Sequence, residues 1–348
     1  MILFLIRRLC QAVLVMFIIS AIGFAIQGGL GDPVQQRLGA AATETEASML
    51  RHSLGLDDPL WVQYLAFAND ALHLDFGHSY FFHEPALGVI ARYLPATLEL
   101  VAASAVLTLL LSVPMGVFCA IRPHSWLSKT LMGLSVIGIS VPVFLTAMVL
   151  IQVFSIGIQV TLFPADSGWG HWLNQLFSIE GGMPAYGRGN PIHVVGVWYT
   201  NFASLQGLLY LLLPALSLAL VMLPLFVRLI HAEMLEVLET DYVKYARARG
   251  LRPSRIYFLH ALKNTLLPVV TLGGVQIGTL VAYTLLTETV FQWPGAGLMF
   301  LDAIERADMP LIVAYLMVVG LLFVVINTLV DLLYRLLNPR ITLSGRAA

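Results

Sequence analysis

The chain has 348 residues, of which 58% are hydrophobic and only 11% charged; the formal net charge is −1 and the mean hydropathy is +0.83. Soluble domains carry about 25% charged residues, so this composition excludes one large water-soluble domain and indicates a membrane protein.

Long uncharged apolar runs recur along the whole chain. A helical span needs about 20 apolar residues to cross roughly 30 Å of hydrocarbon, and inside lipid the backbone must satisfy its own hydrogen bonds. We therefore predict an all-α, polytopic membrane protein with six transmembrane helices. The third run is too long for one upright span, and we expect its tail from about residue 157 to leave the bilayer. The six runs are 9–27, 100–121, 130–165, 205–227, 264–287 and 309–330.

The first apolar run follows Arg7 and Arg8, as a secretory signal would. The run is too long for such a signal and no clear cleavage site follows, so we expect a retained first span. Cys10 and Cys119 both lie in apolar runs, which predicts packing inside the spans and no disulfide framework.

The segment 28–97 is long, acidic and patterned. The Asp57-Asp58-Pro59 sequence is a helix start signal, and apolar residues follow it at helical spacing. We therefore expect a short amphipathic helix in this segment. The residues that carry the pattern are Leu60, Tyr64, Leu65 and Phe67.

Basic residues are distributed unevenly among the loops. Fourteen of the 19 Lys and Arg residues lie in the N-terminus, 122–129, 228–263 and the C-terminal tail. Lys and Arg accumulate on the cytoplasmic side of membrane proteins. We therefore predict that both termini are cytoplasmic and that 28–97 is external (periplasmic).

The predicted cytoplasmic loop 234–263 has helical periodicity with a clear interruption. We expect a first helix over about 238–249, ended by Gly250 in the left-handed conformation. Pro253 suits the first turn of a second helix, which we expect to continue from about 254 into the fifth span.

The first helix of this loop is slim and basic. Tyr242, Tyr245, Ala246 and Arg249 are spaced to share one face. Such a helix, the first part of the segment 238–262, is suited to insert into a groove on a partner protein. The alternative is that its basic residues only fix the topology, although this leaves the two tyrosines and the Gly–Pro interruption unexplained.

Several sequence blocks resemble one known family. The stretch "DYVKYARARGL" followed by "HALKNTLLPVV" resembles the cytoplasmic coupling loop of ABC-importer permeases, specifically the dipeptide/oligopeptide/nickel group. The resemblance covers nearly the whole chain and implies the fold of type I ABC-importer permeases. The other matching blocks are "GDP" (31–33), "LGLDDPLWVQYL" (54–65), "DFGHSY" (75–80), "LPATLEL" (94–100), "ETVFQWPGAG" (288–297) and "LVDLLYRLLNPRI" (329–341).

The resemblance implies a transport subunit that is not itself an enzyme. Its partners would be a second homologous permease, two ATP-binding subunits, an external solute-binding protein and membrane lipid, with no nucleic acid. No G-x-x-x-x-G-K-[ST] phosphate-binding loop occurs in these 348 residues, so ATP and Mg²⁺ are expected on the partner subunits and no cofactor on this chain. The expected ATPase-coupling residues are Asp241, Tyr242, Tyr245, Ala246, Arg247, Ala248, Arg249, Gly250 and Leu251.

Three features depart from the wider importer superfamily. The Glu-Ala-Ala triplet of that superfamily reads Lys244-Tyr245-Ala246 here, and its later proline is displaced to Pro268. Both departures are usual for the peptide group. The second external loop, 163–202, is longer than the compact family version, so the substrate stays open among peptides, nickel, opines, glutathione and related solutes.

Weakly polar residues inside the spans are candidates to line a solute pathway, with ordinary helix packing as the alternative for each. A lipid-facing amide is costly, which singles out the two glutamines. Glu288, at the predicted external mouth, either meets a cationic substrate group or pairs locally. The candidates are Ser140, Thr146, Gln152, Ser217, Thr271, Gln276, Thr284 and Glu288.

No catalytic or metal motif is evident among the nine histidines or the acidic residues of the spans. The predicted organisation is an N-terminus and first span (1–27), the external segment, a permease core (98–338) and a cytoplasmic tail (339–348). A self-contained channel or secondary transporter is the main alternative, and an intramembrane enzyme a distant one.

Overall fold

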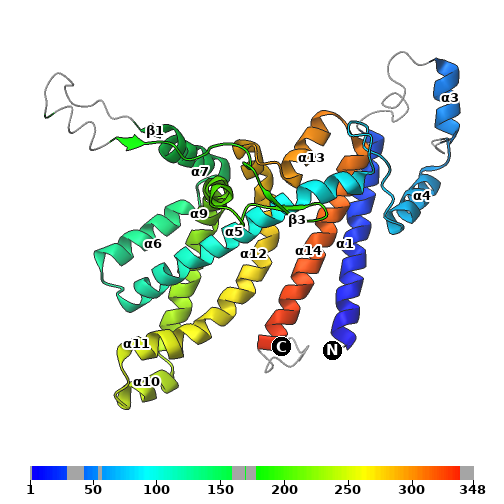
Figure 1. Cartoon of the computed structure of the whole chain (residues 1–348). Coiled ribbons are helices and arrows are strands. Elements are labelled where there is room, and N and C mark those ends of the chain that lie inside the picture. Colours follow the sequence, from blue (N-terminus) through cyan, green and yellow to red (C-terminus); the bar gives the residue numbers. More distant parts are fainter. Residues whose placement is uncertain (1, 30–42, 54–56, 159–168, 170–177, 338–348) are drawn as a thin grey trace. The chain divides into compact units, whose positions relative to one another are not determined.

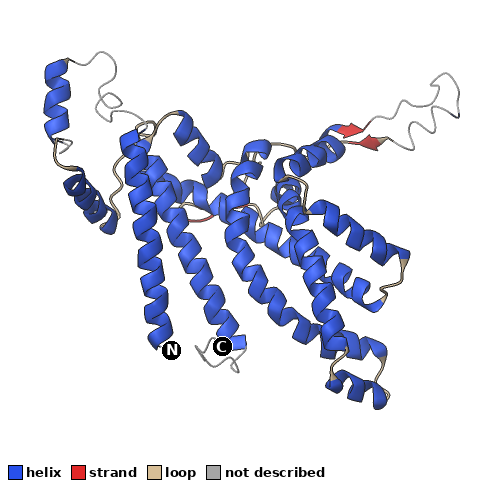
Figure 2. Ribbon diagram, turned by 180° about the vertical axis from the view of Figure 1, so that it is seen from behind, coloured by secondary structure: helices blue, strands red, loops and turns tan. Residues whose placement is uncertain are grey.

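A computed structural model describes every residue except 1, 30–42, 54–56, 159–168, 170–177 and 338–348 (Figure 1). The described part is mostly helical, as Figure 2 shows. Its helices are α1 (Ile2–Gly29), α3 (Glu44–Ser53), α4 (Leu60–Leu72), α5 (Ala86–Ile121), α6 (Trp126–Gly138), α7 (Val143–Leu150), α9 (Leu205–Leu238), α10 (Asp241–Ala248), α11 (Pro253–Arg255), α12 (Leu262–Phe291), α13 (Ala296–Glu305) and α14 (Met309–Leu337), with π-helical turns η1 (Ile151–Ile156) and η2 (Ile256–Ala261).

The strands are short. β1 pairs with β2 in an antiparallel two-stranded sheet. The strands are β1 (Gly157–Ile158), β2 (Ile179–Glu180), β3 (Ile192–Val195) and β4 (Trp198–Thr200).

Five of the described helices are long and apolar enough to cross a membrane, and a bent pair makes a sixth if it counts as one span. The predicted six spans therefore correspond to α1, α5, the pair α6 and α7–η1, α9, the continuous stretch α11–η2–α12, and α14.

The third span is not one continuous helix. Its two halves are bent by 118° at a break between Gly138 and Val143. Pro142 lacks an amide hydrogen and disfavours helical backbone at the residue before it, so the helix breaks there. The helix ends at Ile156, close to the predicted exit near residue 157, and Gly157 begins a strand with a φ of +92°.

The chain divides into two compact units. The first comprises Met1–Pro95, Gly196–Trp198 and Gly295–Thr328, and the second comprises Ala96–Val195, Tyr199–Pro294 and Leu329–Ala348.

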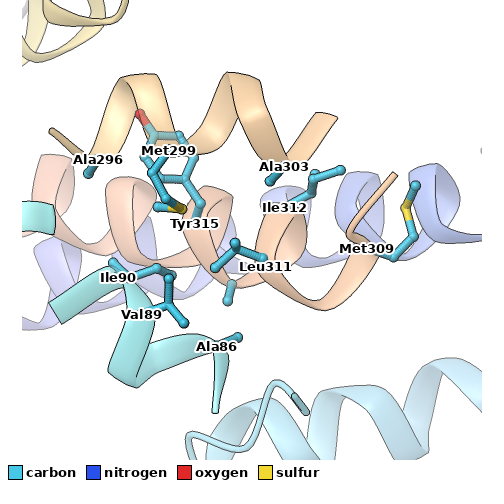
Figure 3. Close-up of a cluster of buried hydrophobic side chains, with 11 residues drawn as sticks. Ala86, Val89, Ile90, Ala296, Met299, Ala303, Met309, Leu311, Ile312 and Tyr315 are labelled. Carbon is cyan, nitrogen blue, oxygen red and sulfur yellow. The ribbon is translucent and has the colours of Figure 1, made fainter. Parts of the chain in front are cut away.

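The first unit has an apolar core between the start of α5, α13 and the beginning of α14 (Figure 3). Met299 and Tyr315 point toward one another across α13 and α14 in this view, and Tyr315 stacks on Phe300 with 4.2 Å between ring centroids.

A buried carboxylate also stabilises the first unit. Asp308, 1% exposed, lies just before α14 and accepts hydrogen bonds from the Ser79 hydroxyl and from the backbone N–H groups of Tyr80 and Phe81. These bonds hold the loop between α4 and α5 on the α13–α14 connection.

The second unit is built around α9. α12 packs along α9, and α6 and α7 pack against it as well. In both views α10 and α11 lie at the end of the α9–α12 pair, where they join the two long helices (Figures 1 and 2).

Candidate functional site

The predicted coupling loop has the helix–glycine–proline–helix form that its sequence indicates. α9 continues to Leu238, so the short helix begins at Asp241 and not near residue 238. Gly250 has a φ of +74°, and Leu251 and Gly250 donate backbone hydrogen bonds to Ala246 and Arg247, respectively. This bond pair is a Schellman motif, which ends a helix at a left-handed residue. Pro253 is the first residue of α11, as predicted.

One expectation about the face of α10 is wrong. Ala246 is buried together with Val243, whereas Tyr242, Tyr245 and Arg249 are exposed. Ala246 and Val243 therefore form the inner face of α10, which is turned toward the rest of the protein. The two tyrosines and the arginine therefore lie on the outer side of the helix.

Two side-chain contacts define the outer surface of α10. Tyr242 accepts a 2.7 Å hydrogen bond at its phenolic oxygen from the Asn264 amide on α12. The Arg249 guanidinium lies 4.9 Å from the ring centroid of Tyr245, a cation–π distance. The first contact ties α10 to α12. The predicted coupling residues that are exposed are Asp241, Tyr242, Tyr245, Arg247, Ala248, Arg249 and Gly250, and Leu251 is half-buried.

A cavity of about 230 Å³ lies inside the second unit. It is bounded by α5, α9, α12 and Val330 of α14, and its walls are mostly apolar. Its polar lining residues are Thr108, Thr271 and Gln276. Two of the predicted pathway residues, Thr271 and Gln276, are therefore brought together here.

The other predicted pathway residues do not line this cavity. Ser140 is exposed in the break between α6 and α7. Gln152 donates to the Gly157 carbonyl at 3.1 Å, which places its amide at the end of η1. Thr284 is buried and donates to the Val281 carbonyl of its own helix at 2.7 Å. The contacts of Gln152 and Thr284 fit local packing, which is the alternative to a place in the solute pathway.

Glu288 is not at an open mouth. It is 0% exposed and accepts a 2.6 Å hydrogen bond from the Thr97 hydroxyl of α5. Beside it, the indole N–H of Trp293 donates to the Ala96 carbonyl at 3.1 Å. The local-pairing alternative therefore describes Glu288 better than contact with a substrate amine.

A buried ion pair near Glu288 was missed by the sequence analysis. Glu99 of α5 is 2% exposed at its side chain, and its carboxylate pairs with the Arg188 guanidinium at 2.7 Å. The backbone N–H of Asn201 donates to the same carboxylate oxygen. Arg188 and Asn201 both belong to the long loop 163–202, so the described part of this loop around them is fixed to α5 by a charged, buried contact. The sequence did hold a signal for this ion pair, because Arg188 is the one Lys or Arg residue of that loop.

Together the geometry defines a class: a polytopic helical membrane protein with an apolar, partly open pocket between its helices and a short basic helix–turn–helix that projects from two of its spans. The family model "Binding-protein-dependent transport system inner membrane component" matches residues 112–343, and the model of its N-terminal region matches residues 1–101. The chain belongs to this family and is a multi-pass inner-membrane protein.

Curated relatives match nearly the whole length of this chain. The chain is 34% identical over 340 residues to the dipeptide transport system permease protein DppB of Escherichia coli (strain K12), covering 97% of this chain and 98% of the relative. It is 35% identical over 340 residues, with the same coverage, to the di/tripeptide transport system permease protein DppB of Pseudomonas aeruginosa. A solved structure of the MetNI methionine ABC transporter in inward-facing conformations aligns with a TM-score of 0.48 and 16% identity, covering 72% of this chain and 97% of that one.

Proposed function

We propose that this chain is the peptide-conducting permease subunit of an ATP-driven importer. It forms half of the translocation pathway, and a second homologous permease forms the other half. Two ATP-binding subunits, which carry ATP and Mg²⁺, bind the α10–α11 surface, and an external binding protein delivers the solute. Both termini face the cytoplasm in this proposal, as the distribution of Lys and Arg favours.

One observation carries the coupling role: α10 presents Tyr245, Arg247 and Arg249 outward while Tyr242 bonds to α12. If the ATP-binding subunits hold α10 by its outer face, α10 moves together with α12, to which it is hydrogen-bonded. Nucleotide binding then shifts the population between two packed arrangements of the spans.

The glycine at the end of α10 provides the test. Gly250→Val introduces a β-branched residue where φ is +74°, a conformation that such residues rarely adopt. No atom lies within 4 Å of an added Cβ, so the substitution changes the backbone turn and creates no clash. We expect loss of ATP-dependent peptide uptake while the protein still reaches the membrane.

Gly250→Asn is the matched control, since Asn tolerates the left-handed conformation. It should retain much more uptake than Gly250→Val. Normal uptake by the valine variant would contradict the coupling role, and ATP-independent flux through the chain alone in liposomes would favour a channel or secondary transporter.

Peptides are the favoured solute because the curated relatives described above are named as dipeptide and di/tripeptide permeases. Nickel, opines and glutathione are the alternatives. Co-purification of the assembled transporter identifies its binding protein, and titration of that protein with dipeptides, Ni²⁺ and glutathione separates them. Binding of Ni²⁺ or glutathione without peptide binding would overturn the peptide assignment.

A further inference from the structure

The amphipathic helix α4 is attached to a membrane span and has an uncovered apolar side. Its residues Tyr64 and Phe67 pack on α1, with ring centroids of Tyr64 6.0 Å from Phe17 and 5.6 Å from Phe24. The phenolic oxygen of Tyr64 is also 2.8 Å from the Ser20 hydroxyl. Both helices belong to the first compact unit.

The position of these contacts along α1 sets the depth of α4. The apolar window of α1 extends from Arg8 to Ile26, and only 11% of it is buried within the protein. Ser20 lies six residues before Ile26, which at 1.5 Å per residue places it about 9 Å inside the end of the window. The residue that Tyr64 contacts is therefore below the membrane surface.

The side of α4 next to its α1-facing side forms an apolar stripe. Trp61, Leu65 and Leu72 are 67%, 58% and 83% exposed, and their spacing of four and seven residues puts them on one side of a helix. Asp70 lies about 140° around the helix from Leu65 at 100° per residue, and it is exposed as well. A tryptophan-bearing apolar side opposite a polar one is typical of helices that lie in the membrane interface, about 5–10 Å deep.

We infer that α4 is an interfacial helix, seated in the lipid leaflet at the Ile26 end of α1 with Trp61, Leu65 and Leu72 inserted among the acyl chains. The occupant of the exposed stripe is lipid, because α4 is fixed to α1 at a depth where the first span itself faces lipid. In the proposed orientation this is the external leaflet, and only that assignment of the leaflet rests on the proposed function. The helix thereby anchors the middle of the external segment 28–97 at the membrane surface.

Spin-label accessibility in the assembled transporter tests this inference. The full chain carries Cys10→Ser and Cys119→Ala, is reconstituted with its co-purifying subunits into phosphatidylethanolamine–phosphatidylglycerol vesicles, and is labelled at one introduced cysteine. Leu65→Cys reports on the stripe, Asp70→Cys on the polar side, and Ile22→Cys on the exposed lipid-facing surface of α1. Collisions with oxygen report lipid exposure and collisions with a water-soluble nickel complex report water exposure.

We expect the oxygen-to-nickel collision ratio at Leu65→Cys to approach that at Ile22→Cys and to exceed that at Asp70→Cys several-fold. Equal nickel accessibility at positions 65 and 70 would show that α4 lies in water. Shielding of position 65 from both reagents would show that a protein subunit covers the stripe. Either result overturns the inference, and neither readout depends on transport, so the proposed function is tested separately.

Discussion

Buried charge is the residue-scale feature with the largest expected energetic effect. Glu99 and Arg188 are 2.7 Å apart with 2% and 9% of their side chains exposed, so each ion has lost most of its water. Removing one partner of such a pair leaves an uncompensated charge, which costs about 3–5 kcal/mol. The two residues lie 89 positions apart in the sequence, so local sequence patterns did not predict the ion pair.

Arg188→Met should therefore lower the thermal unfolding midpoint of the purified protein and free loop 163–202 from α5. Hydrogen exchange of the loop amides near Asn201 should rise, because the Asn201 N–H donates to the Glu99 carboxylate that loses its partner. Unchanged midpoint and exchange would contradict the structural role of the pair.

The Arg92–Glu84 pair is the matched control. Its atoms are 2.6 Å apart, but its side chains are 45% and 50% exposed. Exposed pairs contribute about 0–1 kcal/mol, so Arg92→Met should leave the midpoint nearly unchanged. A drop as large as that of Arg188→Met would show that burial is not the deciding factor.

Gln276 provides the residue-scale test of the pathway. It is half-buried and lines the cavity, whereas Gln152 is exposed and bonds to Gly157. Gln276→Leu should reduce peptide uptake while leaving the amount of assembled transporter unchanged. Gln152→Leu should have a smaller effect on uptake. The reverse order in a transport assay would remove Gln276 from the predicted pathway.

At the scale of single elements, helix contacts depend on small residues at defined positions. A Cβ added at Gly274 would lie 2.3 Å from a methyl group of Val330, so α12 and the end of α14 approach closely there. The Gly274–Gly278 spacing predicts this kind of contact from sequence, because small residues four apart let helices pack tightly.

Gly274→Ala should therefore destabilise the second unit, by about 1–3 kcal/mol for overpacking. Gly273→Ala is the control, since its Cβ would meet Phe226 at an ordinary 3.6 Å. Thermal unfolding of both variants, and of the Gly274→Ala, Val330→Ala double variant, measures the effect. No loss in Gly274→Ala, or no recovery in the double variant, would contradict the close contact.

The success of the sequence reasoning differs from element to element for physical reasons. The coupling loop was predictable because Gly250 and Pro253 act locally on the backbone. The start of α10 was not, because α9 continues through polar residues to Leu238. A kink at Pro142 could be expected from the proline itself, but the apolar run around it is uniform in hydropathy, so the size of the bend could not be predicted. The cavity depends on four segments distant in sequence, and the sequence pattern indicated only Thr271 and Gln276 of its lining residues.

At the scale of the whole molecule, the predictions concern how the chain acts with its partners. Six apolar segments and the family membership place this chain in an importer, and we propose a role for three of its regions. We propose that α4 contacts lipid, that the cavity between the spans belongs to the solute pathway, and that α10–α11 binds the ATP-binding subunits. The central claim is that this last surface is the docking site of ATP-binding subunits.

Site-specific crosslinking from α10 tests that claim most directly. Tyr245→Cys, exposed on α10, carries a photoreactive group in the assembled transporter, and His124→Cys, exposed in the loop between α5 and α6, is the matched control. We expect the probe at position 245 to crosslink an ATP-binding subunit in high yield, and the probe at position 124 to do so weakly. Crosslinks from position 245 to lipid alone, or none to any nucleotide-binding subunit, would contradict the account.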